Sequence, residues 1–450
     1  MGNTLLGALF GTPAAQALFS DVGWLRRMLD VEAALARAQG RVGVIPAAAV
    51  EPIVAACAEA PDVDAIAQGA ALAGNPAIPL VKALTRRVAD VDPHAAGYVH
   101  WGATSQDILD SAQMLQVREA LALLDADLAR AAHACMALIE RHRATPMVAR
   151  TWLQQALPTR FGVKVAGWLS AITRQRAHIV RLRRDTLALQ LGGAVGTLAS
   201  LGAQGPAVAR ALGEELGLPV GDPWHTQRDR IAEIGAVAGL VVGGLGKIAR
   251  DVALLMQTEV GEVSEAAVAG KGGSSTMPHK RNPVDSAAIL AAAARAPALV
   301  ATLFTGLVQE HERALGAWQQ EWATLPELLS LALGAAAHGA DLLGGLSVDT
   351  ERMRANLDLT HGAVMAEAVS MALGETLGRH TAHELVEQAV RRATKEQRAL
   401  REVLSEEPRV RDELDDHQLA ALFDPLRYTG MAESLIEAAL REAQAQDKES

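Results

Sequence analysis

The chain repeats apolar residues at helical spacing over long stretches. Residues 106–143 contain neither proline nor glycine. Their apolar positions follow a period close to 3.6, at Ile108, Ala112, Leu115, Val117, Leu121, Leu124 and Leu128. A helix of this length runs roughly 55 Å. It cannot bury its apolar side alone, so the pattern predicts equally long partner helices.

Four further segments supply such partners: 161–189, 229–259, 283–312 and 321–346. The clearest stripe lies in 229–259, at Ile231, Ile234, Val237, Val241, Leu245, Ile248, Val252 and Leu255. Many other positions in these segments are alanine or glycine, which allows helices to approach closely, including between subunits. The pattern predicts an all-α protein built on a bundle of long helices.

The two ends of the chain have a different pattern. Prolines divide residues 1–100 into short helices, of which 21–42 is amphipathic through Leu25, Met28, Leu29, Ala33, Leu35 and Ala36. Beyond residue 346 the sequence carries more charge in shorter helical segments. We therefore expect an N-terminal helical domain (1–103), a central long-helix domain (104–346) and a small C-terminal helical domain (347–450).

The composition agrees with a helical protein, and the net charge limits the kinds of molecule that it is expected to bind. Hydrophobic residues make up 50% of the chain but aromatic residues only 3%, so alanine and leucine, both strong helix formers, dominate. The formal net charge of −10 gives no general attraction for nucleic acid or anionic lipid. An anionic substrate would therefore need a local cationic pocket.

The remaining bulk features indicate a cytoplasmic protein. Cys57 and Cys135 have no metal-site or disulfide spacing, and we expect two buried thiols. The N-terminus lacks the basic region of a signal peptide. The longest apolar stretch, 235–246, is too short to span a membrane and has charges nearby, so no membrane association is expected.

Three segments rich in small polar residues interrupt the helical pattern: 100–107 (H-W-G-A-T-S-Q-D), 150–158 (R-T-W-L-Q-Q-A-L-P) and 270–283 (G-K-G-G-S-S-T-M-P-H-K-R-N-P). The third combines glycines, hydroxyls and cations, which suits anion binding beside a catalytic hydroxyl. Glycine and serine alone would fit a flexible linker equally well. The continuation M-P-H-K-R-N-P favours a site, because a linker does not need it.

These motifs resemble those of the fumarase/aspartase superfamily, which includes argininosuccinate and adenylosuccinate lyases. G-S-S-x-M-P-x-K-x-N-P resembles its signature loop, G-A-T-S-Q-D its first motif, and T-W-L-Q-Q-A-L-P its second, T-H-x-Q-x-A-x-P. The resemblance implies a three-domain all-α fold and a homotetramer with the long helices at its core. It also implies active sites built from three subunits, one motif from each. We expect no cofactor.

The resemblance also implies which residues act. Ser274 is the expected base, with Ser275 as the open alternative, and neighbouring backbone N–H groups and Lys280 would activate it. The substrate carboxylate that gains charge would be held by Lys280, Asn282, Thr104 and Ser105. The full set of expected substrate contacts is His100, Thr104, Ser105, Gln106, Thr151, Trp152, Gln154, Arg230, Lys280 and Asn282.

Trp152 departs from the family pattern, which has a histidine that helps to protonate the leaving group. Tryptophan has only an N–H donor and cannot do this. Amine and hydroxide leaving groups need a proton, whereas a carboxylate leaves without one. The substitution therefore favours lactone opening and, in reverse, lactone formation.

Segments 223–230, 271–283, 309–313 and 321–326 also resemble the lactone-forming cycloisomerases of the superfamily. Their substrate is a tricarboxylate, for which Lys280 and then Arg150, Arg230 and Arg313 are candidate cations; surface ion pairing is the alternative for each arginine. Adenylosuccinate lyase or a related fumarate-releasing lyase is the second hypothesis. A non-catalytic helical scaffold is the third, and the intact Ser274 loop argues against it.

Three smaller features have competing interpretations. His100 is either a substrate contact or acid, or a structural histidine. His380 and His383 fit no zinc-binding pattern, so we expect an exposed helix face and no metal. The glycine run 192–196 lacks the rest of a phosphate loop, and we expect a bend between helices.

Overall fold

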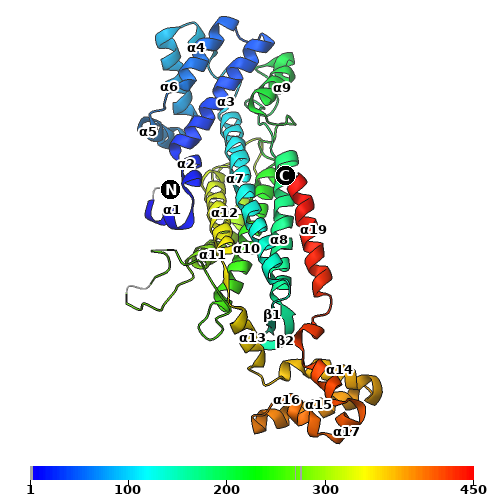
Figure 1. Ribbon diagram of the computed structural model, residues 1–450. Helices are drawn as coiled ribbons and strands as arrows, with labels where there is room; N and C mark the ends of the chain where they lie inside the picture. Colours follow the sequence, from blue (N-terminus) through cyan, green and yellow to red (C-terminus); the bar gives the residue numbers. More distant parts are fainter. Residues whose placement is uncertain (1–3, 269, 274–275, 450) are drawn as a thin grey trace. The chain divides into compact units, whose positions relative to one another are not determined.

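The computed structural model describes residues 4–268, 270–273 and 276–449, and Figure 1 shows its helices and strands. The long helices of the central region are α7 (Ser105–His142), α8 (Phe161–Arg181), α10 (Asp229–Leu255), α11 (Val284–Thr305) and α12 (Glu321–Gly344). The N-terminal helices are α1 (Thr4–Phe10), α2 (Pro13–Leu18), α3 (Asp21–Val42), α4 (Ala47–Ala58), α5 (Val63–Ala73) and α6 (Ala77–Val91).

The later helices are shorter. They are α9 (Gly205–Leu216), α13 (Thr350–Asp358), α14 (Ala366–Leu377), α15 (Arg379–Glu396), α16 (Leu400–Glu406), α17 (Pro408–Glu413), α18 (Asp416–Leu422) and α19 (Ala432–Glu449). Single turns are η1 (Ala95–Tyr98), η2 (Leu182–Thr186), η3 (Gly202–Gln204), η4 (Ala363–Met365) and η5 (Pro425–Tyr428). The described strands are β1 (Pro146–Thr151), β2 (Gln154–Arg160), β3 (Val263–Ser264) and β4 (Ser347–Val348), in two antiparallel pairs, so the all-α class holds.

The long helices follow the predicted pattern closely. α7 covers the proline- and glycine-free segment, and all seven of its predicted apolar positions are buried. All eight stripe positions of α10 and all six of α3 are buried as well. The two cysteines are also buried, as expected, and burial raises the pKa of Cys57 to about 12.

Two expected helix ends were placed too late. α11 ends at Thr305 rather than at residue 312, because Gly306 follows and turns the chain, donating its N–H to the Leu303 carbonyl at 3.1 Å. α8 ends at Arg181 rather than at residue 189, and a π-helical turn, η2, follows it. Residues 306–320 are consequently a connecting segment between α11 and α12, and this segment belongs to the site described below.

The chain divides into two compact units. Unit 1 comprises residues 1–128, 175–246 and 288–338. Within it, α3 packs against α4 and α9, and α5 packs against α6, at the top of the view in Figure 1. The expected three-domain division, 1–103, 104–346 and 347–450, stays a prediction.

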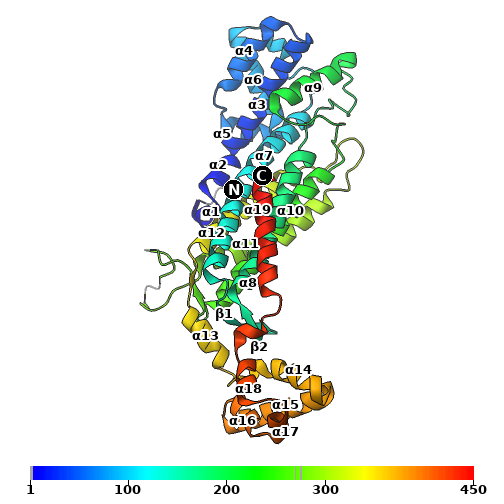
Figure 2. The same cartoon turned by 45° about the vertical axis from the view of Figure 1, so that its right-hand side comes forward.

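Unit 2 comprises residues 129–174, 247–287 and 339–450. Its β1–β2 hairpin packs against α13 and η4, and α19 lies along α8, where Arg143 and Arg160 pair with Glu433 (Figure 2). Helices α14–α18 enclose an apolar core of their own, formed by Val369, Leu373, Ala382, Leu385, Val386, Ala389, Ala393, Leu400, Val403, Leu404, Val410 and Leu419.

Two long helices have unusually apolar surfaces. By length and composition alone α10 and α11 could each cross a membrane, a test that core helices of soluble proteins also pass. The most apolar stretch of α10 is 61% buried within the chain, but that of α11 is only 28% buried. α11 therefore presents apolar surface that nothing in the described chain covers.

Gly334 in α12 has no room for a side chain. A Cβ atom there would lie 1.8 Å from the Phe10 carbonyl oxygen at the end of α1. We expect Gly334→Ala to lower the free energy of unfolding by about 1–3 kcal/mol, because the backbone of residues 10–11 must move. Thermal unfolding and proteolysis of the N-terminal segment measure this. Gly167→Ala in α8, where a Cβ meets nothing within 4 Å, is the matched control and should gain helix propensity. Equal unfolding temperatures for the two variants would contradict the argument.

Candidate functional site

The first motif forms the start of α7 in unit 1. The Thr104 backbone N–H donates to the Asp107 carboxylate at 3.0 Å, which is the backward half of a capping box. Ser105 is the first residue of the helix and is half-buried. The backbone conformation around Thr104 and Ser105 is thus fixed by a side chain one turn into the helix.

Asp107 is 1% exposed and accepts hydrogen bonds from two other segments of the chain. The N–H groups of Gly192 and Gly193 donate to it at 2.8 and 2.9 Å, and His225 Nε2 lies 3.0 Å from its Oδ1. Gln190 Nε2 adds a long contact of 3.4 Å. Burying a carboxylate costs free energy unless hydrogen-bond donors surround it. Here the donors to Asp107 connect the start of α7 with the 190–193 turn and with residue 225.

Arg313 connects two of the expected substrate contacts. Its Nε donates to Gln106 Oε1 at 3.0 Å, and its Nη2 donates to Thr104 Oγ1 at 3.1 Å and to the Ala194 carbonyl at 3.0 Å. These acceptors are all neutral, and Arg313 forms no salt bridge with any described residue. An exposed, uncompensated guanidinium beside Thr104 is an arrangement that can bind a carboxylate.

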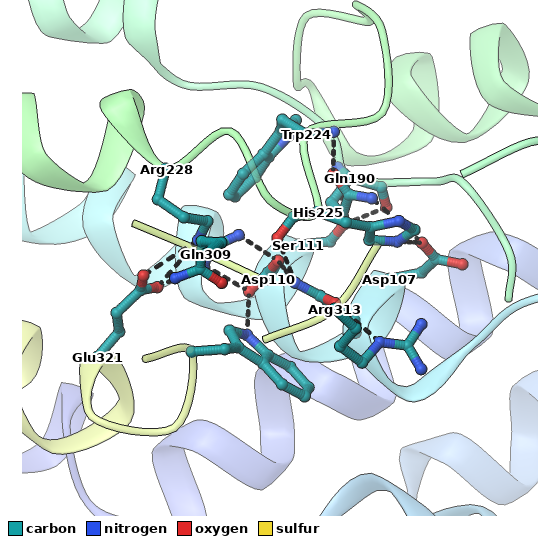
Figure 3. A network of polar contacts seen from close by, with 12 residues as sticks. Asp107, Asp110, Ser111, Gln190, Trp224, His225, Arg228, Gln309, Arg313 and Glu321 are labelled. Carbon is teal, nitrogen blue, oxygen red and sulfur yellow. Dashed lines mark hydrogen bonds and ion pairs between the residues drawn. The ribbon is translucent and has the colours of Figure 1, made fainter. Parts of the chain in front are cut away.

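A second charged cluster lies one turn further along α7 (Figure 3). Arg228, 2% exposed, donates to both Asp110 oxygens at 2.7 and 3.1 Å and through Nε to Glu321 at 3.1 Å. Trp318 Nε1 donates to Asp110 at 3.1 Å, and the Arg228 guanidinium stacks 4.7 Å from the Trp224 ring centre. Two buried carboxylates therefore share one cation.

The surroundings of Glu321 in this cluster change the pKa of its carboxyl group. Burial raises the pKa of Glu321 to about 7, against the opposing pull of Arg228, and the negative charge of Asp110 adds to the rise. The same cluster raises the pKa of Arg228. We therefore regard Arg228 as always charged and Glu321 as the group that titrates near neutral pH.

Two other expected contacts in unit 1 have structural partners. His100 has a positive φ of 57°, and its Nδ1 lies 2.6 Å from the buried Glu32 carboxylate. Burial pushes the pKa of His100 down, but the ion pair with Glu32 outweighs it, and the net shift is upward. Arg230 donates to the carbonyls of Asp185 and Thr186. The substrate-binding roles of both residues stay predictions.

The second motif is a β-hairpin in unit 2. Thr151 and Gln154 face each other at the ends of β1 and β2, and Trp152 and Leu153 form the turn between them. Both turn residues have positive φ, 51° and 64°, which side chains other than glycine rarely adopt. Trp152 is 97% exposed within the chain. The hairpin thus presents an indole at its tip.

Arg150, an expected substrate cation, is already neutralised. It makes a two-pronged contact with Glu262, at 3.0 and 2.7 Å, and Glu262 is fully buried. Asn356 Nδ2 also donates to Glu262, at 2.7 Å. Arg150 is therefore better explained as an anchor of the hairpin than as a substrate ligand.

The signature loop, 270–283, is held at its base. Lys271 pairs with Asp285, the Asn282 N–H donates to the Gly272 carbonyl at 2.8 Å, and Arg281 Nη2 donates to the Glu265 carbonyl at 2.9 Å. Gly272 has φ of 70°, and a Cβ there would lie 2.6 Å from the Asn282 carbonyl oxygen.

The chemistry-bearing part of the loop is more open. Lys280 is exposed and forms no ion pair with any described residue, and Asn282 is half-buried. Ser274 and Ser275 lie outside the described residues. Within unit 2 the structure thus brings Thr151 together with Gln154.

The residues that sequence reasoning missed are the buried charges behind the first motif. Asp107, Asp110, Gln190, His225, Arg228, Trp318 and Glu321 were not among the expected site residues. One signal was available: segments 223–230, 309–313 and 321–326 had been picked out by resemblance, and all three meet at the start of α7. The glycine run 192–196 is indeed a bend, but its N–H groups also bind Asp107.

Comparisons with known proteins cover nearly the whole chain. The family model described as "Lyase" matches residues 11–298, and that described as "Adenylosuccinate lyase C-terminus" matches residues 362–439. A 3-carboxy-cis,cis-muconate cycloisomerase of Pseudomonas aeruginosa is 58% identical over 445 residues, covering 98% of this chain and 97% of its own length.

Two further relatives show the range of the similarity. The crystal structure of the 3-carboxy-cis,cis-muconate lactonizing enzyme from Pseudomonas putida matches with a TM-score of 0.94 and 50% identity, over 99% of this chain and 100% of that one. A nitrosuccinate lyase of Streptomyces davaonensis is 47% identical, over 96% of this chain and 92% of its own.

The Asp110–Arg228–Glu321 cluster predicts a pH dependence of stability. The pKa of Glu321 is higher in the folded chain, about 7, than its ordinary value of 4.5. The folded state therefore binds more protons between these values, and this group makes folding less favourable as pH rises from about 4.5 to 7. Glu321→Gln cannot titrate, so this decrease in stability with pH should be absent in the variant. The melting temperature of the variant relative to the wild type should therefore rise between pH 4.5 and 7.

Glu327→Gln is the matched control, since Glu327 lies on the same helix in a surface pair with Arg295. Melting curves at pH 5, 6 and 7 measure all three proteins. Parallel pH profiles for Glu321→Gln and the wild type would show that Glu321 does not titrate here.

Proposed function

The chain belongs to the lyase family, within the fumarase/aspartase superfamily, and from this premise we propose that it is a 3-carboxy-cis,cis-muconate cycloisomerase. It would interconvert 3-carboxy-cis,cis-muconate and 4-carboxymuconolactone, in the protocatechuate branch of the β-ketoadipate pathway, as a soluble enzyme of the cytoplasm. The observation that carries the proposal is the 58% identity to a cycloisomerase over nearly the full length of both chains.

The reaction needs only a positioned acid and fixed charges. In ring closure a substrate carboxylate oxygen adds to a carbon of the double bond, and the π electron pair moves to the neighbouring carbon. That carbon lies next to another carboxylate, which spreads the developing charge. A proton from Ser274 then forms the new C–H bond, and in ring opening the serine takes the proton back. The group that leaves in ring opening is a carboxylate, which needs no proton.

Trp152 supports this substrate class. Its indole can donate one hydrogen bond but cannot deliver a proton to a leaving group. At the tip of the hairpin it would supply a flat apolar surface and one N–H to the substrate. This role is compatible with lactone chemistry and disfavours the release of an amine.

Arg313 and Lys280 are the cations best able to hold the carboxylates. Arg313 contacts only neutral acceptors, and Lys280 has no ion-pair partner among the described residues. Arg150, in contrast, is already paired with the buried Glu262. With Thr104, Ser105 and Asn282 supplying hydrogen bonds, these two cations offset part of the charge of a tricarboxylate. Gln106 is fully buried and already bonded to Asp110, the His225 carbonyl and Arg313, so it would act by holding Arg313.

The proposal includes a homotetramer with active sites shared by three subunits. Its support is exposed apolar surface: large side chains on and after α11 are open within one chain, namely Phe304, Leu307, Val308 and Leu315. The almost fully exposed Trp152 is a second support, since an indole in a site motif needs an environment that excludes water. Analytical ultracentrifugation tests the assembly; a monodisperse monomer would refute it.

Adenylosuccinate lyase, or another fumarate-releasing lyase, is the second candidate, favoured by the match of residues 362–439 to an adenylosuccinate lyase model. One assay set separates the two. The purified protein should change the ultraviolet absorbance of 3-carboxy-cis,cis-muconate as the diene is consumed, and it should leave adenylosuccinate unchanged. An inactive but correctly assembled protein would remove the cycloisomerase assignment, and release of AMP would establish the alternative.

Ser274→Ala should leave the assembly intact and lower turnover on the order of 10²–10⁴-fold, because the proton donor is lost. Ser275→Ala is the matched control and separates the two serines, which the sequence leaves open. Diene absorbance gives the rates. If Ser275→Ala is the inactive variant instead, the acid–base role belongs to Ser275; if both keep full turnover, the donor lies outside this loop.

Trp152→His should not increase the rate of lactone formation. A histidine restores a group able to protonate a leaving group, but the carboxylate has no use for it. We expect equal or lower kcat with an unchanged assembly, and Trp152→Phe serves as the control that keeps an aromatic ring. A clear gain in kcat for Trp152→His would contradict the argument from leaving-group chemistry.

A further inference from the structure

Unit 1 contains a cavity that the proposed reaction does not use. It has a volume of about 500 Å³ and lies between the start of α3, one face of α5 and Trp322 at the start of α12. Its lining residues are Asp21, Trp24, Leu25, Val63, Ile66, Ala67, Ala70, Ala71, Gly74, Asn75, Pro76 and Trp322. None of these is an expected catalytic or substrate-binding residue. The volume is within the usual range for small-molecule sites.

The cavity is lined by small residues on α5 and by two tryptophan rings, an arrangement that suits a flat ligand. On α5, Ala67, Ala70, Ala71 and Gly74 lie at helical spacing and leave the space open. The Trp24 and Trp322 rings also line it, with centres 6.2 Å apart and planes tilted by 56°. Aromatic ligands pack well against such indole faces and edges.

One polar group of the lining is buried and has no partner among the described residues. The Trp322 Nε1–H is buried and finds no acceptor among the described residues. The Asp21 carboxylate at the first turn of α3 is exposed to solvent, and it makes no hydrogen bond or ion pair within the described chain. A buried unpaired N–H costs free energy, and a ligand with an acceptor at this position would remove that cost.

The charge of the lining excludes one ligand class. Asp21 is the only ionisable residue among the lining residues, so the one charge that borders the cavity is negative, although solvent screens it. A tricarboxylate, or any aromatic carboxylate, would be repelled. A hydroxyl group, in contrast, can donate to Asp21 or accept from Trp322 Nε1, since it does both.

We propose that this cavity is a second binding site for an uncharged, hydroxylated aromatic compound of one or two rings, separate from the proposed tricarboxylate site. The site is connected to the first one through tryptophan packing. The Trp322 ring meets the Trp318 ring edge-on, 4.8 Å between centres, and Trp318 donates to Asp110 on α7. A ligand in the cavity would therefore contact Trp322, whose ring packs against the side chain that donates to Asp110 at the start of α7.

Binding of 6-fluoro-2-naphthol to the full-length protein, followed by fluorine NMR, tests the proposal. We expect saturable line broadening at one site per chain. 6-Fluoro-2-naphthoate has the same ring system with a carboxylate in place of the hydroxyl, and it should bind at least tenfold more weakly. Equal affinity for the two compounds would overturn the ligand class, and no saturable binding of the naphthol would overturn the site.

Two variants fix the location. Ala70→Leu fills the cavity and should weaken naphthol binding at least tenfold, while Ala65→Leu, the same change at an exposed position of α5 outside the cavity, should not alter it. Trp322→Phe keeps an aromatic ring but removes the N–H, and it should weaken naphthol binding severalfold. This second variant still tests the location if Ala70→Leu does not fold. Wild-type affinity in both cavity variants would place the ligand elsewhere and overturn the proposal.

Discussion

The Asp107 carboxylate, buried and surrounded by donors, is the interaction on which unit 1 depends. A carboxylate that has lost its water must be satisfied by the protein, and here the N–H groups of Thr104, Gly192 and Gly193 and the ring of His225 do this. These groups come from three segments far apart in the chain. Satisfying one charge thus fixes the start of α7, the 190–193 turn and residue 225 as one assembly.

The consequence reaches the side chains that face solvent. With the start of α7 fixed, Thr104 and Gln106 hold their acceptor oxygens toward Arg313, whose guanidinium is left without a carboxylate. Behind them, Arg228 is shared between Asp110 and Glu321, and burial raises the pKa of Glu321 to about 7. The polar interior therefore supports an exposed cation, and this is the arrangement expected where an anion binds.

Unit 2 uses the same principle differently. Glu262 is fully buried and takes both prongs of Arg150, while Glu265 accepts the N–H groups of Asp285 and Ser286 at the start of α11. These buried acids anchor the hairpin and the base of the signature loop. What they leave exposed is Trp152 at one tip and Lys280 on the other loop. Rigid anchors and open tips are consistent with the proposed sharing of sites between subunits.

The sequence by itself determined the helical framework. The stripes of α3, α7 and α10 are buried where the 3.6-residue period placed them, because burial of an apolar face is a local consequence of spacing. The polar motifs were also readable as non-helical segments, and their resemblance identified the family. The hairpin form of the second motif was not predicted, since its turn depends on Trp152 and Leu153 adopting a conformation that their residue types disfavour.

Only the tertiary structure decided which charges are free. From the sequence Arg150, Arg230 and Arg313 were all candidate cations, with Arg230 alone among the expected substrate contacts, and nothing in their neighbours along the chain shows which of them is paired. Their partners come from far away: Glu262 neutralises Arg150 across 112 positions, backbone carbonyls hold Arg230, and Arg313 meets only neutral acceptors. Periodicity records which side of a helix is buried, but the pairing of charges depends on distances in space that spacing along the chain does not contain.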